Sequence, residues 1–334
     1  MPETAVDIWF CASARSGLGH LMRCHAIACA LAQRRPELRL GMIANAPPVA
    51  FDTRQAGPFA EHVIVERDRM AAAVMSRPPR LVVADTLVMP GIETLTMPRA
   101  LIMREMPDDR LAAFGCADRP WDLVVIPNPV HEWQPRLPAG FTVESVHAGW
   151  IYRRTPSVRR RLACDPMLLV SFGGGGNALT RRMLAEQIEP MIHLARQASE
   201  QRFDVVQVRG PRASRQDGLS GADRFIEVGG KLNQWLARAD VVISTVGYNS
   251  ILELAQTDVP AMLIPIERSI DDQARRARQW GPRLGHHHRE GDLENSASWL
   301  AQTITGRRRR PPIDLGPSGQ DQAAAALERL LERR

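Results

Sequence analysis

One histidine stands at an unusual position in the first half of the chain. His20 lies in the stretch SGLGHLMRC, residues 16–24, where an apolar run typical of a buried strand gives way to a helical pattern over residues 21–33. Ligands of open parallel sheets bind beyond the carboxyl ends of the strands, so this turn should face a ligand crevice. The positive end of the helix disfavours an imidazolium and leaves a neutral imidazole that can accept a proton. A capping or packing role for His20 is the alternative.

Two glycines, Gly17 and Gly19, flank this turn and would let the backbone approach an acceptor or a phosphate. The stretch is no dinucleotide fingerprint, because Met22 stands where the third glycine should be, and no Lys-Ser/Thr pair completes a P-loop.

Two acidic residues end predicted strands in the same half, Asp85 in VVADTL and Glu105 in IMREMPDD. Both should point into the crevice that His20 faces. We therefore take His20, Asp85 and Glu105 as candidate catalytic residues, and for each acid a structural role stays equally open.

Two glycine-containing turns in the second half could hold a nucleotide diphosphate. In SFGGGGNALTRRML, residues 171–184, four glycines exceed what a turn needs and suit a loop whose N–H groups wrap phosphate oxygens. A loose loop is the alternative. In STVGYNSILELAQ, residues 244–256, a strand ends and a helix starts near Asn249, which offers a second phosphate site.

Glu253 lies one helical turn further on, at i, i+4 from Asn249. Its carboxylate could accept hydrogen bonds from the vicinal hydroxyls of a ribose, or could simply favour the helix dipole. Asp272 and Gln273 open a later helix, where they could contact sugar hydroxyls or form a capping pair. The predicted donor-binding residues are Gly173, Gly174, Gly175, Gly176, Asn177, Gly247, Tyr248, Asn249, Ser250, Glu253, Asp272 and Gln273.

We expect no metal site and no cofactor. Residues 286–288 are three histidines, but neighbours on a strand point to alternate sides and no acidic or cysteine partner is near. No Asp-x-Asp occurs anywhere, which removes the usual carboxylate clamp for a nucleotide-bound divalent cation.

Short apolar runs alternate with helical patterns along all 334 residues, which favours an α/β fold with parallel sheets covered on both faces. Helices are predicted near residues 21–33, 179–198, 232–238, 249–256, 271–279 and 321–331. Strands are predicted at 6–12, 38–44, 62–65, 81–84, 100–103, 123–126, 143–147, 167–171, 205–208, 225–228, 241–244 and 261–264.

The pattern breaks at residues 148–165, which are polar and arginine-rich and read as a linker. We expect two domains, residues 1–150 as an acceptor-binding domain and residues 151–334 as a nucleotide-sugar donor domain. Whether the last helix packs on the first domain is left open.

The charge of the sequence limits the classes of molecule that the protein is expected to bind. The net charge is +6, almost entirely from arginine, and the arginines cluster at 34–35, 153–154, 159–161 and 307–310. We expect no nucleic acid, since no basic stretch is interleaved with aromatic residues, and no obligate protein partner. Five scattered cysteines and the lack of an apparent signal peptide fit a cytoplasmic protein, with peripheral contact at the inner membrane face left open.

Two stretches resemble a known group of enzymes. GLGHLMRCHAIACALA resembles the N-terminal signature of the UDP-sugar hydrolase of the pseudaminic acid pathway, and the first loop of the peptidoglycan N-acetylglucosaminyltransferase of glycosyltransferase family 28. VGYNSILELAQTDVPAMLIPIERSIDDQARRA is similar to the nucleotide-binding half of that transferase and to predicted glycosyltransferases. The resemblance implies a GT-B fold, in which two Rossmann-like domains with doubly wound parallel sheets face each other across a cleft.

By position, the resemblance implies that Glu253 holds the ribose of UDP, that the glycine loops hold the diphosphate, and that His20 is the base. Gln273, with Asp272, would contact the donor sugar, and Glu105 would lie near the acceptor. The segment ADTLVMPG departs from the transferase's glycine-rich sequence, which puts that enzyme's lipid-linked acceptor in doubt.

The leading hypothesis is an inverting, metal-independent glycosyltransferase that moves a sugar from a nucleotide-diphosphate sugar to an acceptor hydroxyl. A UDP-sugar hydrolase in which His20 activates water is the second hypothesis. A module that binds nucleotide or sugar without catalysis is the third.

Overall fold

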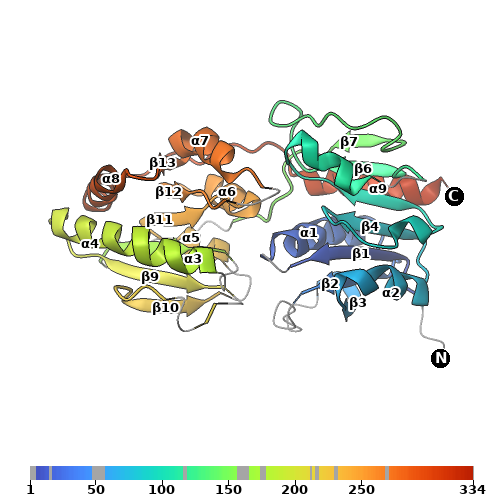
Figure 1. Ribbon diagram of the computed structural model, residues 1–334, viewed down its shortest axis with the longest axis horizontal. Helices are drawn as coiled ribbons and strands as arrows, with labels where there is room; N and C mark the ends of the chain where they lie inside the picture. The colour runs from blue at the N-terminus through green and yellow to red at the C-terminus, as the bar shows by residue number, and fades with distance from the viewer. Residues whose placement is uncertain are drawn as a thin grey trace. The chain divides into compact units, whose positions relative to one another are not determined.

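The structure is a computed structural model that describes residues 5–14, 17–46, 57–115, 119–155, 165–173, 178–210, 213–214, 218–228, 232–267 and 271–333. The chain forms two compact units, one of Met1–Tyr152 with Gly316–Arg334 and one of Arg153–Leu315 (Figure 1). The chain thus enters the second unit at Arg153. Its last helix, placed by sequence in the range 151–334, is part of the first unit.

The first unit is built on a parallel sheet of seven strands in the order β3-β2-β1-β4-β5-β6-β7. The strands are β1 (Ile8–Ser13), β2 (Leu40–Asn45), β3 (Phe59–Ile64), β4 (Leu81–Asp85), β5 (Arg99–Ile102), β6 (Leu123–Ile126) and β7 (Ser145–His147). The helices are α1 (Gly19–Arg34), α2 (Met70–Ser76) and α9 (Gly319–Glu332), with 3-10 turns at Arg67–Arg69, Ile92–Thr94 and Asp108–Phe114.

Both faces of this sheet are buried, which explains the continuous apolar runs. Along β1, Ile8 and Phe10 pack into one core together with residues of α1 and α9, whereas Trp9 and Cys11 pack into a second core with residues of α2. Successive side chains of a strand point to opposite faces, so a strand covered on both sides must be apolar at every position.

Helix α9 packs against α1 through the same core as β1. Gly319 starts α9 against the backbone of the segment after β7, and its N–H donates to the Trp150 carbonyl at 2.8 Å. A Cβ atom at Gly319 would lie 2.6 Å from the carbonyl oxygens of Ala148 and Gly149, so only glycine allows this approach. Ion pairs join Arg34 of α1 to Glu328 of α9.

The second unit is built on a parallel sheet of six strands in the order β10-β9-β8-β11-β12-β13. Its strands are β8 (Met167–Ser171), β9 (Asp204–Arg209), β10 (Arg224–Glu227), β11 (Val241–Thr245), β12 (Ala261–Ile264) and β13 (Gly285–His287). Its helices are α3 (Ala178–Met183), a π-helical turn at Leu184–Ile188, α4 (Glu189–Ala198), α5 (Leu232–Leu236), α6 (Tyr248–Ala255), α7 (Gln273–Leu284) and α8 (Leu293–Thr305).

Helices α4 and α8 pack against each other and against one face of this sheet in a single apolar core. Helices α5, α6 and α7 contact one another in that order (Figure 1). The predicted fold class is confirmed, since each unit is a parallel sheet with covering helices. Prediction from the sequence missed α2, α8 and the three-residue edge strand β13. Within the described residues, no helix is long and apolar enough to cross a membrane.

Candidate functional site

The first candidate site lies at the carboxyl edge of the sheet in the first unit. His20 is in the first turn of α1, which follows β1, and Asp85 is the last residue of the neighbouring strand β4. His20 Nδ1 lies 2.9 Å from Asp85 Oδ1. The side chain of His20 is 19% exposed, whereas that of Asp85 is fully buried. The structure therefore brings together two of the three predicted catalytic residues.

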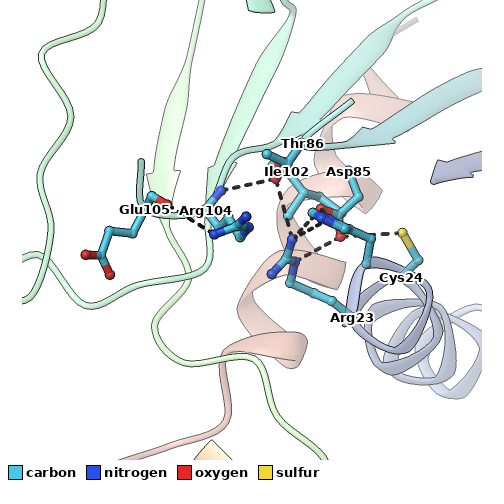
Figure 2. A network of polar contacts seen from close by, with 8 residues as sticks. Arg23, Cys24, Asp85, Thr86, Ile102, Arg104 and Glu105 are labelled. Carbon is cyan, nitrogen blue, oxygen red and sulfur yellow. Dashed lines mark hydrogen bonds and ion pairs between the residues drawn. The ribbon is translucent and has the colours of Figure 1, made fainter. Parts of the chain in front are cut away.

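Arg23, one turn further along α1, binds the same carboxylate (Figure 2). Its Nε donates to Asp85 Oδ2 at 2.9 Å and its Nη2 donates to Asp85 Oδ1, so the ion pair is bidentate. The Cys24 thiol donates to Oδ2 at 3.7 Å. Burial alone would raise the pKa of Asp85, but Arg23 and His20 outweigh it and hold the pKa well below its usual range. Asp85 is therefore ionised at neutral pH.

Two groups compete for His20 Nδ1. Asp85 Oδ1 lies 2.9 Å away and can only accept, whereas Arg23 Nη2 lies 3.1 Å away and can only donate. We assign the proton to Nδ1, because the carboxylate oxygen is the nearer partner and would repel a lone pair there, and this assignment leaves the lone pair on Nε2. Burial lowers the pKa of His20, and Arg23 and Arg104 lower it further, against the opposing effect of Asp85. The imidazole is thus neutral at neutral pH and can accept a proton through Nε2.

Thr86 follows Asp85 in a strained conformation. Its φ is 44°, in the left-handed region that a β-branched residue rarely adopts. Its backbone N–H and its hydroxyl both donate to the Ile102 carbonyl, at 2.7 and 3.0 Å, and the hydroxyl accepts from Arg104 N at 3.4 Å (Figure 2). These bonds hold the backbone turn that directs the Asp85 carboxylate toward α1. Strain of this kind concentrates at functional sites.

Glu105 is not brought to this pair. Figure 2 shows its carboxylate pointing away from Asp85, while its backbone carbonyl accepts from Arg104 Nη1 at 3.4 Å. A catalytic role for Glu105 stays a prediction that this geometry does not support.

Gly17 lies two residues before α1, and Gly19 begins the helix. Leu18 provides no side-chain cap, and no acidic residue lies in the first turn. A Cβ atom at Gly17 would meet no other atom within 4 Å. Their assignment to an acceptor or phosphate loop stays a prediction.

The second candidate site lies at the carboxyl edge of the sheet in the second unit. Gly173, two residues after β8, has φ +68°, a conformation that favours glycine. The rest of the predicted loop, Gly174, Gly175, Gly176 and Asn177, lies outside the described residues. Gly247 precedes α6 in an extended conformation without a side-chain cap, so the N–H groups of Tyr248, Asn249 and Ser250 begin the helix. Such a start suits an anion.

Glu253 lies on α6 and binds an arginine that sequence reasoning did not place there. Arg153 Nη2 donates to Glu253 Oε1 at 2.6 Å, with side-chain exposures of 25% and 8%. A buried carboxylate on the same helix as the proposed phosphate site fits a role in ribose binding, which stays a prediction.

Asp272 and Gln273 make the contacts of a cap and a brace. Asp272 Oδ1 accepts from Arg275 N at 2.8 Å and caps α7. Gln273 is 3% exposed, and its Oε1 accepts from the backbone N–H groups of Val246 and Ile266 at 3.3 and 3.1 Å. These contacts match the capping alternative, and they join the turns that follow β11 and β12.

A buried ion pair completes this brace. Arg276 donates to Asp271 Oδ1 through two nitrogens at 3.0 and 2.9 Å and to the Val246 carbonyl at 2.8 Å, and Gln273 Nε2 donates to Asp271 Oδ2 at 3.1 Å. The turn before α6 is therefore held from the start of α7.

Two of the three histidines at 286–288 serve packing. His286 Nε2 and His288 Nδ1 both contact the Ser296 hydroxyl, at 3.0 and 2.7 Å, and the His286 ring stacks on Trp299. Within the part of the chain that the structure describes, no group of three or more His, Cys, Asp or Glu side chains could hold a metal ion.

The arginine clusters at 34–35 and 307–310 have internal partners. Arg34 and Arg35 pair with glutamates of α9, Glu328 and Glu332. Arg310 donates to the carbonyls of Val259 and Leu254, the latter at the end of α6. These arginines tie chain segments together, and the cluster at 159–161 lies outside the described residues.

Sequence reasoning missed Arg23, Arg153, Asp271 and Arg276. Arg23 had a signal, because it stands at i, i+3 from His20 and therefore shares its helix face. Arg153 had none, because it precedes its partner by 100 residues.

Comparisons with known proteins agree with the two-unit architecture. Residues 169–285 match the profile of the glycosyltransferase family 28 C-terminal domain. None of the curated proteins matches the chain. Among solved structures, the calicheamicin glycosyltransferase CalG4 is similar with a TM-score of 0.57 at 16% identity, over 99% of each chain.

Two further solved structures show how wide this fold is. MurG of Acinetobacter baumannii has a TM-score of 0.51 at 15% identity, over 97% of this chain and 99% of its own. The UDP-GlcNAc 2-epimerase of Methanocaldococcus jannaschii, solved with UDP-GlcNAc and UDP, has a TM-score of 0.60 at 10% identity, over 96% of this chain and 99% of its own. Identities this low establish the fold alone, and the epimerase shows that the fold hosts more than one reaction. The chain therefore has the GT-B fold, with residues 169–285 of its second unit matching the C-terminal domain of glycosyltransferase family 28.

Proposed function

We propose that this protein is a glycosyltransferase that moves a sugar from a nucleotide-diphosphate sugar, with UDP as the expected nucleotide, to an acceptor hydroxyl. The observation that carries the proposal is the His20–Asp85 pair at the carboxyl edge of the first sheet, because its geometry gives a neutral imidazole with a free Nε2 lone pair. The match of residues 169–285 to a glycosyltransferase domain supports the choice of reaction.

In the proposed reaction His20 is the general base. Nε2 accepts the proton of the acceptor hydroxyl while the acceptor oxygen attacks the anomeric carbon, and the bond from that carbon to the diphosphate oxygen breaks. Attack from the face opposite the leaving group inverts the anomeric configuration. Asp85 holds the imidazole by its Nδ1–H and stabilises the imidazolium that forms.

The donor would bind the second unit. Backbone N–H groups at the start of α6 and at Gly173 would stabilise the charge that develops on the leaving diphosphate. Glu253 would accept hydrogen bonds from the ribose hydroxyls. With no Asp-x-Asp clamp in the sequence, we assign this charge stabilisation to the backbone and helix dipole and expect no dependence on a divalent cation.

The first experiment asks whether a nucleotide binds. The thermal midpoint of the protein is measured with UDP, other nucleoside diphosphates and their sugar conjugates, since a ligand at 100 times its dissociation constant adds about 2.7 kcal/mol of stability. A panel that produces no shift contradicts the proposal. Tight binding with no turnover of any donor and acceptor would indicate a binding module.

The second experiment tests the base. With a turned-over donor and acceptor, His20→Ala should reduce kcat by about 10²–10⁴-fold, while His25→Ala, a histidine on the same helix outside the pair, leaves it unchanged. Unchanged transfer by His20→Ala refutes the role of His20. Stoichiometric release of UDP and free sugar in the absence of acceptor would indicate a hydrolase, and inhibition by EDTA would contradict the metal independence.

A further inference from the structure

The first residues of the second unit, 153–155, form a strap along helix α6. The Gln256 carboxamide pairs with the strap at two points, since its Nε2 donates to the Arg153 carbonyl at 2.9 Å and its Oε1 accepts from Thr155 N at 2.9 Å. Asn233 of α5 donates to the Arg154 carbonyl between them, at 3.1 Å. The backbone of all three strap residues is therefore fixed to the second unit.

The anchored strap places the Arg153 side chain on Glu253. Gln256 follows Glu253 by three residues, so the carboxylate and the strap's anchor lie on the same side of α6. The Thr155 hydroxyl also contacts the Glu253 carbonyl, at 3.4 Å. Arg153 Nη2 then reaches Glu253 Oε1 at 2.6 Å, the short separation typical of a charge-assisted hydrogen bond.

The contact with Arg153 uses one oxygen of the Glu253 carboxylate, Oε1. An ionised carboxylate has about four lone-pair positions on its two oxygens, and Arg153 Nη2 takes one of them on Oε1. The side chain of Glu253 is 8% exposed, so a ligand that covers it would remove most of its remaining water. A guanidinium already bound to the carboxylate reduces the cost of that desolvation and fixes the direction of its free oxygen.

We propose that Arg153 is a positioning residue for nucleotide recognition, which holds the Glu253 carboxylate so that its free oxygen accepts hydrogen bonds from the vicinal hydroxyls of a ribonucleoside diphosphate. This rests on the proposed function, which places the donor nucleotide at α6. Arg153 acts through Glu253, so its effect should depend on the hydroxyls that Glu253 would bind. A 2′-deoxyribonucleotide lacks one of them and leaves a charged acceptor without its donor, a loss that typically reduces affinity by about ten- to a hundredfold.

The experiment compares UDP with 2′-deoxy-UDP by isothermal titration calorimetry on the full chain. The wild-type protein should bind UDP at least about tenfold more tightly than 2′-deoxy-UDP. Arg153→Gln should weaken UDP binding by about tenfold, change 2′-deoxy-UDP binding much less, and bring the ratio of the two dissociation constants to about one to three. Arg153→Lys keeps the charge and should restore most of the ratio.

The matched control is Arg154→Gln. Arg154 is the next residue of the strap, and its side chain is exposed. It contacts Asn233 through its backbone carbonyl, so replacing its side chain removes the same charge without changing the contact to Glu253. This variant should bind both nucleotides as the wild type does. Gln256→Leu loosens the strap while keeping Arg153, and it should lower the ratio in the same direction as Arg153→Gln.

The outcomes separate the two proposals. If the wild-type protein binds neither nucleotide, the proposed function fails and the role of Arg153 fails with it. If UDP binds and Arg153→Gln leaves the ratio unchanged, only the role of Arg153 is overturned. Tighter UDP binding by Arg153→Gln also overturns it, because Arg153 would then compete with the ribose for Glu253. If Arg153→Gln and Arg154→Gln weaken UDP binding equally, the lost positive charge explains the effect, and the role of Arg153 is overturned.

Discussion

Replacing Arg23 by glutamine should raise the pKa of His20. Arg23 Nη2 lies 3.1 Å from His20 Nδ1, and its positive charge opposes protonation of the ring. Two unit charges about 4 Å apart interact by about 4 kcal/mol at an effective dielectric constant of about 20, which bounds the free energy by which Arg23 disfavours the imidazolium. The guanidinium charge is spread over three nitrogens, so the actual free energy is smaller than this bound, and its loss should raise the pKa of His20. Without Arg23, Asp85 also stabilises the imidazolium more strongly.

The assay is an NMR titration of the histidine Cε1–H signals, with His20 assigned from a His20→Gln sample. The charged and titratable groups that shift His20 are Asp85, Arg23 and Arg104, so the variants can be chosen by charge. Arg23→Lys keeps the positive charge and should leave the pKa of His20 near its wild-type value. Arg104→Gln should raise it, by less than Arg23→Gln.

Stability is checked alongside, because the Arg23 side chain is 1% exposed and its loss breaks a buried ion pair, at a typical cost of about 3–5 kcal/mol. If Arg23→Gln does not fold, Arg104→Gln carries the test. A pKa of His20 that stays constant or falls when either cation is removed refutes the electrostatic reasoning. In a transfer assay, the acid limb of the kcat/KM profile should move to higher pH together with the pKa of His20.

Three further predictions concern the first unit. Thr86→Val keeps a β-branched residue in the strained conformation and loses the hydrogen bonds of the hydroxyl, so urea unfolding should show a loss of about 1–3 kcal/mol in the free energy of unfolding. Thr86→Gly also relieves the strain, so it should lose less stability than Thr86→Val. A greater loss with Thr86→Gly would contradict the strain. Gly319→Val should undock α9, with a loss of about 1–3 kcal/mol and faster proteolysis of the C-terminal residues; an unchanged digestion pattern contradicts it. Folding lowers the pKa values of Asp85 and His20, so the unfolded chain binds more protons and the free energy of unfolding should fall as pH drops below about 6.5. The measurement is the thermal midpoint as a function of pH. His20→Gln should make the midpoint depend less on pH at the upper end of this range.

The sheets could be predicted because every strand covered on both faces must be apolar throughout. The predicted runs at 123–126, 167–171 and 261–264 coincide with β6, β8 and β12. The edge strand β13, with the sequence GHH, carries no such pattern, because its pairing with β12 uses the backbone alone. A three-residue edge strand of this sequence therefore escapes an analysis based on hydropathy, whereas the longer apolar runs of the edge strands β3 and β10 were predicted.

The meeting of His20 and Asp85 was predictable for a topological reason. Both lie at the carboxyl ends of strands of one parallel sheet, and such ends lie at one edge. The same rule could not separate Asp85 from Glu105, because it places residues at an edge and does not set the direction of each side chain. That direction depends on the Thr86 turn and on Arg23, which are tertiary contacts.

Some of the arginines have a structural role that the composition alone did not suggest. Three buried carboxylates at the candidate sites each bind an arginine, in the pairs Asp85–Arg23, Glu253–Arg153 and Asp271–Arg276. A planar guanidinium can bind a carboxylate through two nitrogens and stays charged when buried, which lysine does less well. These three arginines therefore position carboxylates at the candidate sites.

This use of arginine changes what the positive charge indicates about partners. An arginine that holds a buried carboxylate is neutralised by it, and one that is buried against backbone carbonyls adds to the net charge without offering a surface to an anion. Arg310 is of this kind, since its guanidinium donates to the carbonyls of Val259 and Leu254. The arginines that matter for ligand recognition are instead those that hold the carboxylate of a site. Arg153 is the one whose replacement should change the ratio of the dissociation constants of UDP and 2′-deoxy-UDP.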